Sequence, residues 1–250
     1  MPGGPLNDST YHFLRFLLDA NLWGGELLNA DHLPSSGPAV FVSNHLGALG
    51  PIGVISSIPI RLYPWIIADM VDSRLAPDYL RVDFVERELG LRPPWSMALA
   101  RLIAAISTPL LRSVGCVPVY REAQNLQTTF AMSLSLLQQG KCLLIFPEDP
   151  RLPADPLTRI APFKKGFARL GERYYRQSGT RLPFYPLAVH ESRRVMVGQP
   201  VTYDPLNPRA DERLRIKHLM EHSIREMYLA LSGGGPSPDF GLTRPVEVEG

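Results

Sequence analysis

The sequence has little cysteine, little net charge and no long uninterrupted apolar run. Its two cysteines, Cys116 and Cys142, lie in separate apolar runs and form no Cys-x-x-Cys pair. Because no secretory leader is apparent, we expect both thiols to be reduced core residues in a cytoplasmic compartment. The formal net charge is only +2, which gives no reason to expect a nucleic-acid partner. No window reaches about 18 consecutive apolar residues, which argues against a membrane-spanning helix.

The sequence also lacks the signatures of nucleotide and metal sites. Neither type of glycine-rich phosphate loop is present. His218 and His222 have the spacing of two metal ligands on one helical face, but no convincing third ligand accompanies them. Glu221 lies on a different face of the same helix. We therefore expect no metal site and no bound cofactor.

The pattern of apolar residues predicts an α/β protein. A chain of 250 residues with 45% hydrophobic residues can build a substantial core, and its 25 prolines argue against a helical bundle. Strands are predicted at residues 39–44, 61–68, 116–120, 141–146, 184–189 and 195–201, with Pro64 marking an edge or a bulge. Helices are predicted at 10–28, 51–58, 96–112, 126–139, 163–177 and 207–231. These elements suit a mixed, largely parallel sheet flanked by helices.

Three regions divide the chain. Residues 1–34 form an N-terminal segment, residues 35–232 the α/β domain, and residues 233–250 a flexible tail. The amphipathic helix at 10–28 has a wide apolar arc with aromatic residues at both ends, so it either lies in a lipid interface or packs against the domain. The charged stretch 72–94 suits a solvated insertion. The apolar helix at 96–112 is expected in the core, with shallow membrane contact as the alternative.

Polar side chains follow four of the predicted strands. Asn44 and His45 follow the first, Asp69 the second, Arg121 the third and the segment 148–151 the fourth. Parallel strands would bring these ends together at one edge of the sheet, where open α/β sheets bind ligands. Imidazole is suited to moving a proton near neutral pH, and arginine presents a planar fork of donors to phosphate. The alternative for each residue is a solvated surface group.

Five sequence blocks in this order resemble the glycerolipid acyltransferase family, which includes 1-acylglycerol-3-phosphate and lysophospholipid acyltransferases. The blocks are Ser43-Asn44-His45, Gly115 to Arg121, Phe146 to Arg151, Phe163 to Gly166 and Leu182 to Ala188, and the resemblance spans about residues 38–200. It implies that His45 is the general base that deprotonates a lysolipid hydroxyl. It further implies that Arg121 and Arg151 hold the acceptor's phosphate, with Asn44, Glu148 and the turn from Lys164 to Gly166 assisting binding.

The sequence departs from the family pattern at three places. Gly50 stands five residues after His45, where the family has the aspartate that orients the imidazole. In serine proteases, loss of the analogous aspartate costs about 10⁴-fold in rate. Asp149 and Pro150 replace a Gly-Thr pair, and Asp69 stands where the family often has lysine. We expect Asp69 to supply the missing carboxylate, with Glu148 or Asp149 as the alternative source.

The resemblance predicts transfer of a fatty acyl group from an acyl thioester, acyl-CoA or acyl carrier protein, to a hydroxyl of a phosphate-bearing lysolipid or glycerol phosphate in phospholipid biosynthesis. Because acceptor and product are lipids, it also predicts a peripheral protein on the cytoplasmic side of a membrane. Two alternatives are open. A catalytically impaired relative would bind lipid or acyl carrier without turnover, and a divergent enzyme would use another acceptor or hydrolyse the thioester.

Overall fold

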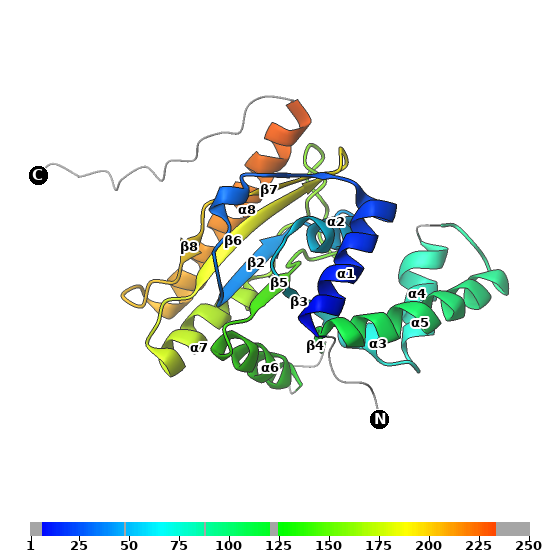
Figure 1. The fold of residues 1–250 in the computed structure, drawn as a ribbon, viewed down its shortest axis with the longest axis horizontal. Helices are drawn as coiled ribbons and strands as arrows, with labels where there is room; N and C mark the ends of the chain where they lie inside the picture. Colours follow the sequence, from blue (N-terminus) through cyan, green and yellow to red (C-terminus); the bar gives the residue numbers. More distant parts are fainter. Residues whose placement is uncertain (1–6, 48, 88, 121–124, 234–250) are drawn as a thin grey trace, which may run out of the picture.

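The computed structural model describes residues 7–47, 49–87, 89–120 and 125–233. They form an eight-stranded sheet with the order β1–β7–β6–β2–β5–β3–β4, and β8 pairs with β6 (Figure 1). The strands are β1 (Glu26–Leu28), β2 (Ala39–Ser43), β3 (Leu62–Ile67), β4 (Val117–Val119), β5 (Cys142–Ile145), β6 (Pro183–His190), β7 (Arg194–Val197) and β8 (Val201–Thr202).

The centre of the sheet is parallel. β2 pairs in parallel with β5 and β6, and β3 pairs in parallel with β5 and β4. β7 and β8 are antiparallel to β6, whereas β1 is parallel to β7. The predicted mixed, largely parallel sheet is therefore confirmed. Because β1 lies in this same sheet, the predicted boundary at residue 35 falls within the sheet's own elements.

Both faces of the sheet are buried. In β2, Val40 and Val42 belong to one hydrophobic cluster, and Ala39 and Phe41 belong to another on the opposite face. This alternation follows from the two-residue period of a strand, and burial on both faces explains why the strand is a continuous apolar run. The ends of the central strands are thus the places where polar side chains reach solvent.

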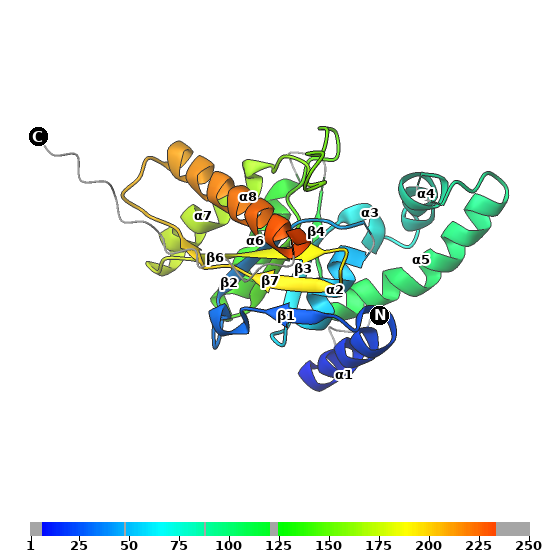
Figure 2. The same cartoon turned by 90° about the horizontal axis from the view of Figure 1, so that it is seen from above.

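Helices cover the two faces. The first cluster is closed by α6 (Leu126–Gln138), α7 (Arg169–Ser178), which follows the short 3-10 turn η4 (Lys165–Ala168), and α8 (Arg209–Gly233). The second is closed by α2 (Leu49–Ser57) and by Trp23. Figure 2 shows α8 and α1 on opposite sides of the sheet. The predicted tail falls mostly on residues 234–250, which lie outside the described residues.

The N-terminal segment differs from the predicted single helix over 10–28. Helix α1 spans Asp8–Leu18, a π-helical turn η1 spans Asp19–Trp23, and residues 26–28 form strand β1. Gly24 ends the helix with a φ of +55°, a conformation that glycine adopts without strain. Tyr11 is buried and its hydroxyl accepts a hydrogen bond from the Leu62 amide, so one face of α1 packs on the domain.

Pro64 lies inside the sheet and not at an edge. Residues 62–64 of β3 pair with β5, and residues 65–67 pair with β4. Because proline cannot donate a ladder hydrogen bond, it is tolerated at the residue where β3 changes partner.

The segment between β3 and β4 is a helical arm, which we define as residues 68–114. It contains α3 (Ala68–Val71), α4 (Ala76–Leu80), a π-helical segment η3 (Arg81–Glu86) and α5 (Trp95–Val114). Figures 1 and 2 show the arm extending sideways from the sheet. Most described residues of 72–94 are exposed or partly exposed, as expected of a solvated insertion, but Ala76, Leu80 and Val85 are buried in a small core that the arm's helices share.

The expected burial of the 96–112 helix in the main core was also wrong. Helix α5 has 20 residues and is strongly apolar, yet only 17% of its most apolar stretch is buried. By length and composition alone it could cross a membrane, which is weak evidence for a span. Its apolar residues therefore do not mark the sheet's core.

Candidate functional site

The strand register brings three of the predicted polar segments to one level. Phe41 of β2 pairs with Leu144 of β5, and Leu144 pairs with Pro64 of β3. Four residues further along these three strands stand His45, Glu148 and Ala68, which directly precedes Asp69. Because the strands are parallel and adjacent strands lie about 4.8 Å apart, these segments share the carboxyl edge of the sheet.

Asn44 fixes the end of β2. It is buried, its side-chain amide nitrogen donates to the Val189 carbonyl at 2.9 Å, and its amide oxygen accepts from the Val189 nitrogen at 2.8 Å. The side chain thus continues the β2–β6 pairing one step beyond Ser43. Both polar atoms are engaged with backbone, so the contacts of Asn44 give it a positioning role.

His45 follows Asn44 directly, just beyond the end of β2. Its side chain is exposed, and the edge of its ring packs against Phe146, with the ring centroids 5.3 Å apart and the planes at 76°. Its backbone nitrogen donates to Oε1 of Glu148 at 2.5 Å. The imidazole therefore stands at the sheet edge on a backbone held from two neighbouring strands.

Glu148 binds backbone on both carboxylate oxygens. Oε1 accepts from His45, and Oε2 accepts from the Ala161 nitrogen at 2.8 Å. Burial raises the pKa of this carboxyl above its usual value, and the two backbone hydrogen bonds offset part of that rise. The sequence suggested that Glu148 orders the acceptor, whereas its contacts in the structure order the His45 turn.

The loop that carries Glu148 is anchored to α8. Glu148 forms an isolated antiparallel bridge with Phe163, and the Phe163 nitrogen donates to Oε2 of Glu221 at 3.0 Å. Glu221 also pairs with Lys217 at 2.8 Å and with Arg225 at 3.1 Å. Sequence reasoning missed Glu221 as a site residue. The i, i+4 spacing of these three charges was visible, but the loop that they support was not.

Arg151 and Lys164 share a single acidic partner. Arg151 donates through Nε and one terminal nitrogen to the two oxygens of Asp149, at 2.9 and 2.7 Å, and Lys164 Nζ lies 3.5 Å from the same carboxylate. The hydrogen bonds from Arg151 hold the pKa of Asp149 well below its usual value. Asp149, which replaces the family's glycine, therefore binds Arg151, the cation that the resemblance assigns to phosphate, and Lys164, to which it assigns a supporting role.

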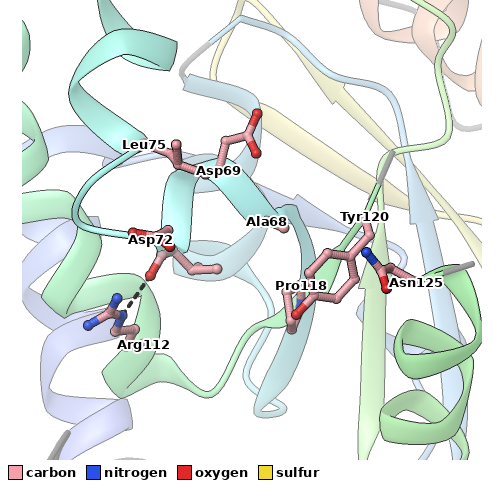
Figure 3. Close-up of a pocket in the computed structure, with 9 residues that line it drawn as sticks. Ala68, Asp69, Asp72, Leu75, Arg112, Pro118, Tyr120 and Asn125 are labelled. Atoms are coloured by element: carbon pink, nitrogen blue, oxygen red, sulfur yellow. Dashed lines mark hydrogen bonds between the residues drawn. The ribbon is translucent and has the colours of Figure 1, made fainter. Parts of the chain in front are cut away.

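Asp69 is the second residue of helix α3 and lines a cavity of about 550 Å³ at the carboxyl ends of β3 and β4. Figure 3 shows its carboxylate on the side of α3 away from Arg112, whose Nε donates to the Val71 carbonyl at 2.7 Å. Tyr120 and Asn125 line the opposite wall. The pairing of Asp69 with the His45 ring stays a prediction, and Arg121 lies outside the described residues.

Two glycines bear on the site. An added Cβ at Gly50 would lie 3.3 Å from the Leu46 Cβ, with the backbone of His45 and Asn44 beyond 3.4 Å, so a side chain there needs only a small shift. At Gly166, in the first turn of η4, an added Cβ would meet nothing within 4 Å. The predicted importance of Gly166 therefore does not come from close packing within the described protein.

The described residues contain no group of three or more His, Cys, Asp or Glu side chains placed to hold a metal ion. His222 lies 3.1 Å from the Glu226 carboxylate. Cys142 is buried and Cys116 is partly buried, and this burial raises the pKa of each thiol to about 11. Both thiols are therefore protonated and unreactive at neutral pH.

Comparisons with known proteins bear on the fold and on the family of part of the chain. The Acyltransferase family model matches residues 77–190, a range that contains Glu148 and Lys164 but begins after His45. A search of the curated proteins finds no significant match. The crystal structure of the 1-acyl-sn-glycerophosphate (LPA) acyltransferase PlsC from Thermotoga maritima is similar over 88% of this chain and 81% of that chain, with a TM-score of 0.51 and 9% sequence identity. Residues 77–190 thus match the Acyltransferase family, and the chain has the fold of a 1-acyl-sn-glycerophosphate acyltransferase.

Proposed function

We propose that this protein transfers a fatty acyl group from an acyl thioester to a hydroxyl of a phosphate-bearing lysolipid. The observation that supports this most directly is the exposed imidazole of His45, held at the carboxyl edge of the sheet by Glu148. The fold and the family match support acyl transfer as the reaction class. The proposed donor is the thioester of coenzyme A or of acyl carrier protein.

The chemical step needs one proton carrier. The neutral His45 ring takes the proton from the acceptor hydroxyl while the hydroxyl oxygen attacks the thioester carbonyl carbon. The tetrahedral intermediate then collapses, the carbon–sulfur bond breaks, and the departing thiolate takes the proton from the imidazolium. The base is thereby regenerated, and no residue of the protein is acylated.

Arg151 and Lys164 are two cations near Glu148, and both contact Asp149, the next residue along the chain. A planar guanidinium and an ammonium are suited to bind the acceptor's phosphate. In the free protein both are paired with Asp149, so phosphate must compete with that carboxylate. We further propose that the protein acts at the cytoplasmic surface of a membrane, where lysolipid acceptors partition.

The test is acyl transfer from long-chain acyl-CoA, and separately from acyl carrier protein, to lysophosphatidic acid. The wild type is compared with His45→Ala and Gly50→Asp. Turnover in the wild type that His45→Ala lowers by about three orders of magnitude or more supports the proposal. Because the His45 side chain is exposed, the variant keeps the fold, which circular dichroism checks.

Two outcomes would contradict the proposal. An inactive wild type together with an active Gly50→Asp variant would identify an impaired relative, an alternative that the missing motif aspartate favours. Free fatty acid released at the full rate without any acceptor would identify a thioester hydrolase.

A further inference from the structure

The helical arm packs through only one face of α5. Ser96, Ala100, Ala104 and Thr108 follow one another at four-residue spacing and are buried. The two alanines pack with Ala76, Leu80 and Val85 in the arm's own core, and the Thr108 hydroxyl donates to the Met70 carbonyl at 3.1 Å. The small buried residues bring α5 close to α4 and η3. Leu99 and Ile103 of α5 pack against the same core, and the opposite face of the helix is left outside it.

The outer face of α5 is an apolar stripe, which we define as Trp95, Leu102, Ile106 and Leu110. Trp95 is 73% exposed, Leu102 60% and Ile106 66%. The spacings of seven, four and four residues place these side chains along one side of the helix. An exposed aliphatic residue alone needs no explanation, but a continuous row of them indicates a binding surface.

The charged side chains of α5 itself have one sign. Residues 95–114 contain two charged side chains, Arg101 and Arg112, and no aspartate or glutamate. Arg92 is exposed just before the helix begins. The acidic residues of the arm, such as Asp78 and Asp83, precede α5 in the chain, so the excess of arginine is confined to α5 and the residues just before it. An apolar stripe with flanking arginines and an exposed tryptophan matches the chemistry of an anionic lipid surface.

We propose that α5 docks the protein on a bilayer by lying in the plane of an anionic membrane surface, with the apolar stripe among the upper acyl chains. The helix lies on the membrane because its inner face belongs to the arm's core and its last residues are tied to the domain. Arg61 donates to the Val114 carbonyl at 3.3 Å and pairs with Asp8 at the start of α1. A spanning orientation would require these contacts to break.

The proposal concerns adhesion and does not depend on the proposed acyl transfer. It also assigns the main docking role to the arm and not to α1, although α1 exposes Phe13 and Phe16. Experiments can distinguish the contributions of α1 and α5 to membrane binding, because the exposed apolar residues of each helix can be substituted separately.

The experiment measures binding of the full-length protein to phosphatidylcholine vesicles with and without phosphatidylglycerol. We expect binding mainly to the anionic vesicles, and about tenfold weaker partitioning of the Leu102→Ser/Ile106→Ser variant, because two half-immersed side chains are lost. Arg92→Gln/Arg101→Gln should weaken binding to anionic vesicles but not to neutral ones. Leu157→Ser/Leu206→Ser, at positions 76% and 85% exposed outside the arm, is the matched control and should bind like the wild type.

Tryptophan fluorescence locates the contact. Of the three tryptophans, Trp23 is buried and Trp65 is partly buried with its indole donating to Ser133, so Trp95 is the exposed one. We expect anionic vesicles to shift the emission to shorter wavelength, and Trp95→Phe to abolish that shift.

Any of four results would overturn the inference. These are no vesicle binding by the wild type, an equal loss in the control pair, an emission shift that persists in Trp95→Phe, or a loss of binding confined to Phe13→Ser/Phe16→Ser. Light scattering gives a fifth test. If Leu102→Ser/Ile106→Ser turns a dimer into a monomer while vesicle binding is intact, the stripe binds a second copy of the chain.

Discussion

The carboxylate of Glu148 joins the backbone nitrogen of His45, at 2.5 Å, to that of Ala161, at 2.8 Å. This contact connects the end of β2 to the loop after β5, and Glu221 connects the same loop to α8 through Phe163. The imidazole therefore stands on a backbone that is held by a carboxylate and, behind it, by a helix from the far end of the chain. Rigid support of this kind fixes where a proton acceptor stands relative to its substrate.

Replacing Glu148 with glutamine tests this support. The amide oxygen can accept from only one of the two backbone nitrogens, and the amide nitrogen would face the other donor. Charge-assisted hydrogen bonds of this kind are worth about 1.5–3 kcal/mol, so we expect kcat for acyl transfer to fall about 10- to 100-fold. Because Glu148 binds backbone in the free protein, KM for the acceptor should change little.

Acceptor binding would give a different result. A rise in KM with unchanged kcat would show that Glu148 contacts the substrate, as the sequence suggested. Glu226→Gln is the matched control, since it removes a carboxylate from the exposed side of α8 that pairs with His222. It should leave both kinetic constants unchanged.

Glu148 and Glu221 should respond to pH with opposite signs. Burial raises the pKa of Glu148, so the folded protein binds that proton more tightly than the unfolded chain. Burial alone would also raise the pKa of Glu221. The hydrogen bonds that Glu221 accepts from Lys217, Phe163 and Arg225 outweigh this effect, so its pKa is lowered. The contribution of Glu148 to the free energy of unfolding therefore increases as the pH falls through its raised pKa, and that of Glu221 is lost as the pH falls below its usual pKa.

Urea unfolding at about pH 7, 5 and 3.5 measures both contributions. The difference in the free energy of unfolding between wild type and Glu148→Gln should shift in favour of the wild type from pH 7 to pH 5. The corresponding difference for Glu221→Gln should shift against the wild type from pH 5 to pH 3.5. If the two differences in the free energy of unfolding shift in the same direction as the pH falls, the loop contacts do not control the protonation of Glu148 and Glu221.

The sequence predicted the central sheet but not what surrounds it. The apolar run ending at Val42 gave β2, and parallel pairing brought the strand ends to one edge as expected. Strand β1 was missed because Leu27 and Leu28 continue an apolar pattern, although Gly24 and Gly25 marked the end of the helix. The exposure of α5 could not be read from composition, because a core helix and a membrane-facing helix have the same apolar residues.

The strand-end positions of the candidate site residues were predicted from the sequence, but the contacts that support them were not. Asn44, His45 and Glu148 stand where the local pattern placed them. Their partners, Val189 and Ala161, contribute backbone atoms, which leave no signature in side-chain chemistry. Glu221 comes from a helix more than 50 residues further along the chain, so only the fold shows that it holds the loop.

Asp149 should limit binding of a phosphate-bearing acceptor. Its carboxylate occupies Arg151 on two nitrogens and lies within ion-pair distance of Lys164. Asp149→Gly, which restores the family's residue, should free both cations and tighten lysophosphatidic acid binding about tenfold, measured by calorimetry. Glu191→Gln removes the same charge from the exposed pair with Arg159 and should have no such effect. Equal gains in both variants would indicate general electrostatics, and no gain would place the phosphate elsewhere.

The last prediction concerns the carboxylate that orients the imidazole. If Asp69 substitutes for the missing motif aspartate, Asp69→Asn should lower kcat by about 10²-fold or more, because the ring loses the partner that fixes its tautomer. Gly50→Asp places a carboxylate five residues after His45, where the Cβ fits after a small shift of Leu46. The double variant Asp69→Asn/Gly50→Asp should then recover most of the activity that Asp69→Asn loses. This recovery separates an orienting role from a structural one, since a residue at position 50 cannot restore the packing of α3.

Asp72 provides the control for this cycle, because it lines the same cavity as Asp69 and begins the turn after α3. Asp72→Asn should leave kcat within about twofold of the wild type, because the Asp72 carboxylate accepts a hydrogen bond from the Arg74 nitrogen within its own turn. If Asp69→Asn is equally silent and Gly50→Asp alone raises kcat, the imidazole of the natural chain works without an orienting carboxylate. In that case the wild-type protein is slow because position 50 is a glycine, and Asp69 lines the cavity without orienting the His45 ring.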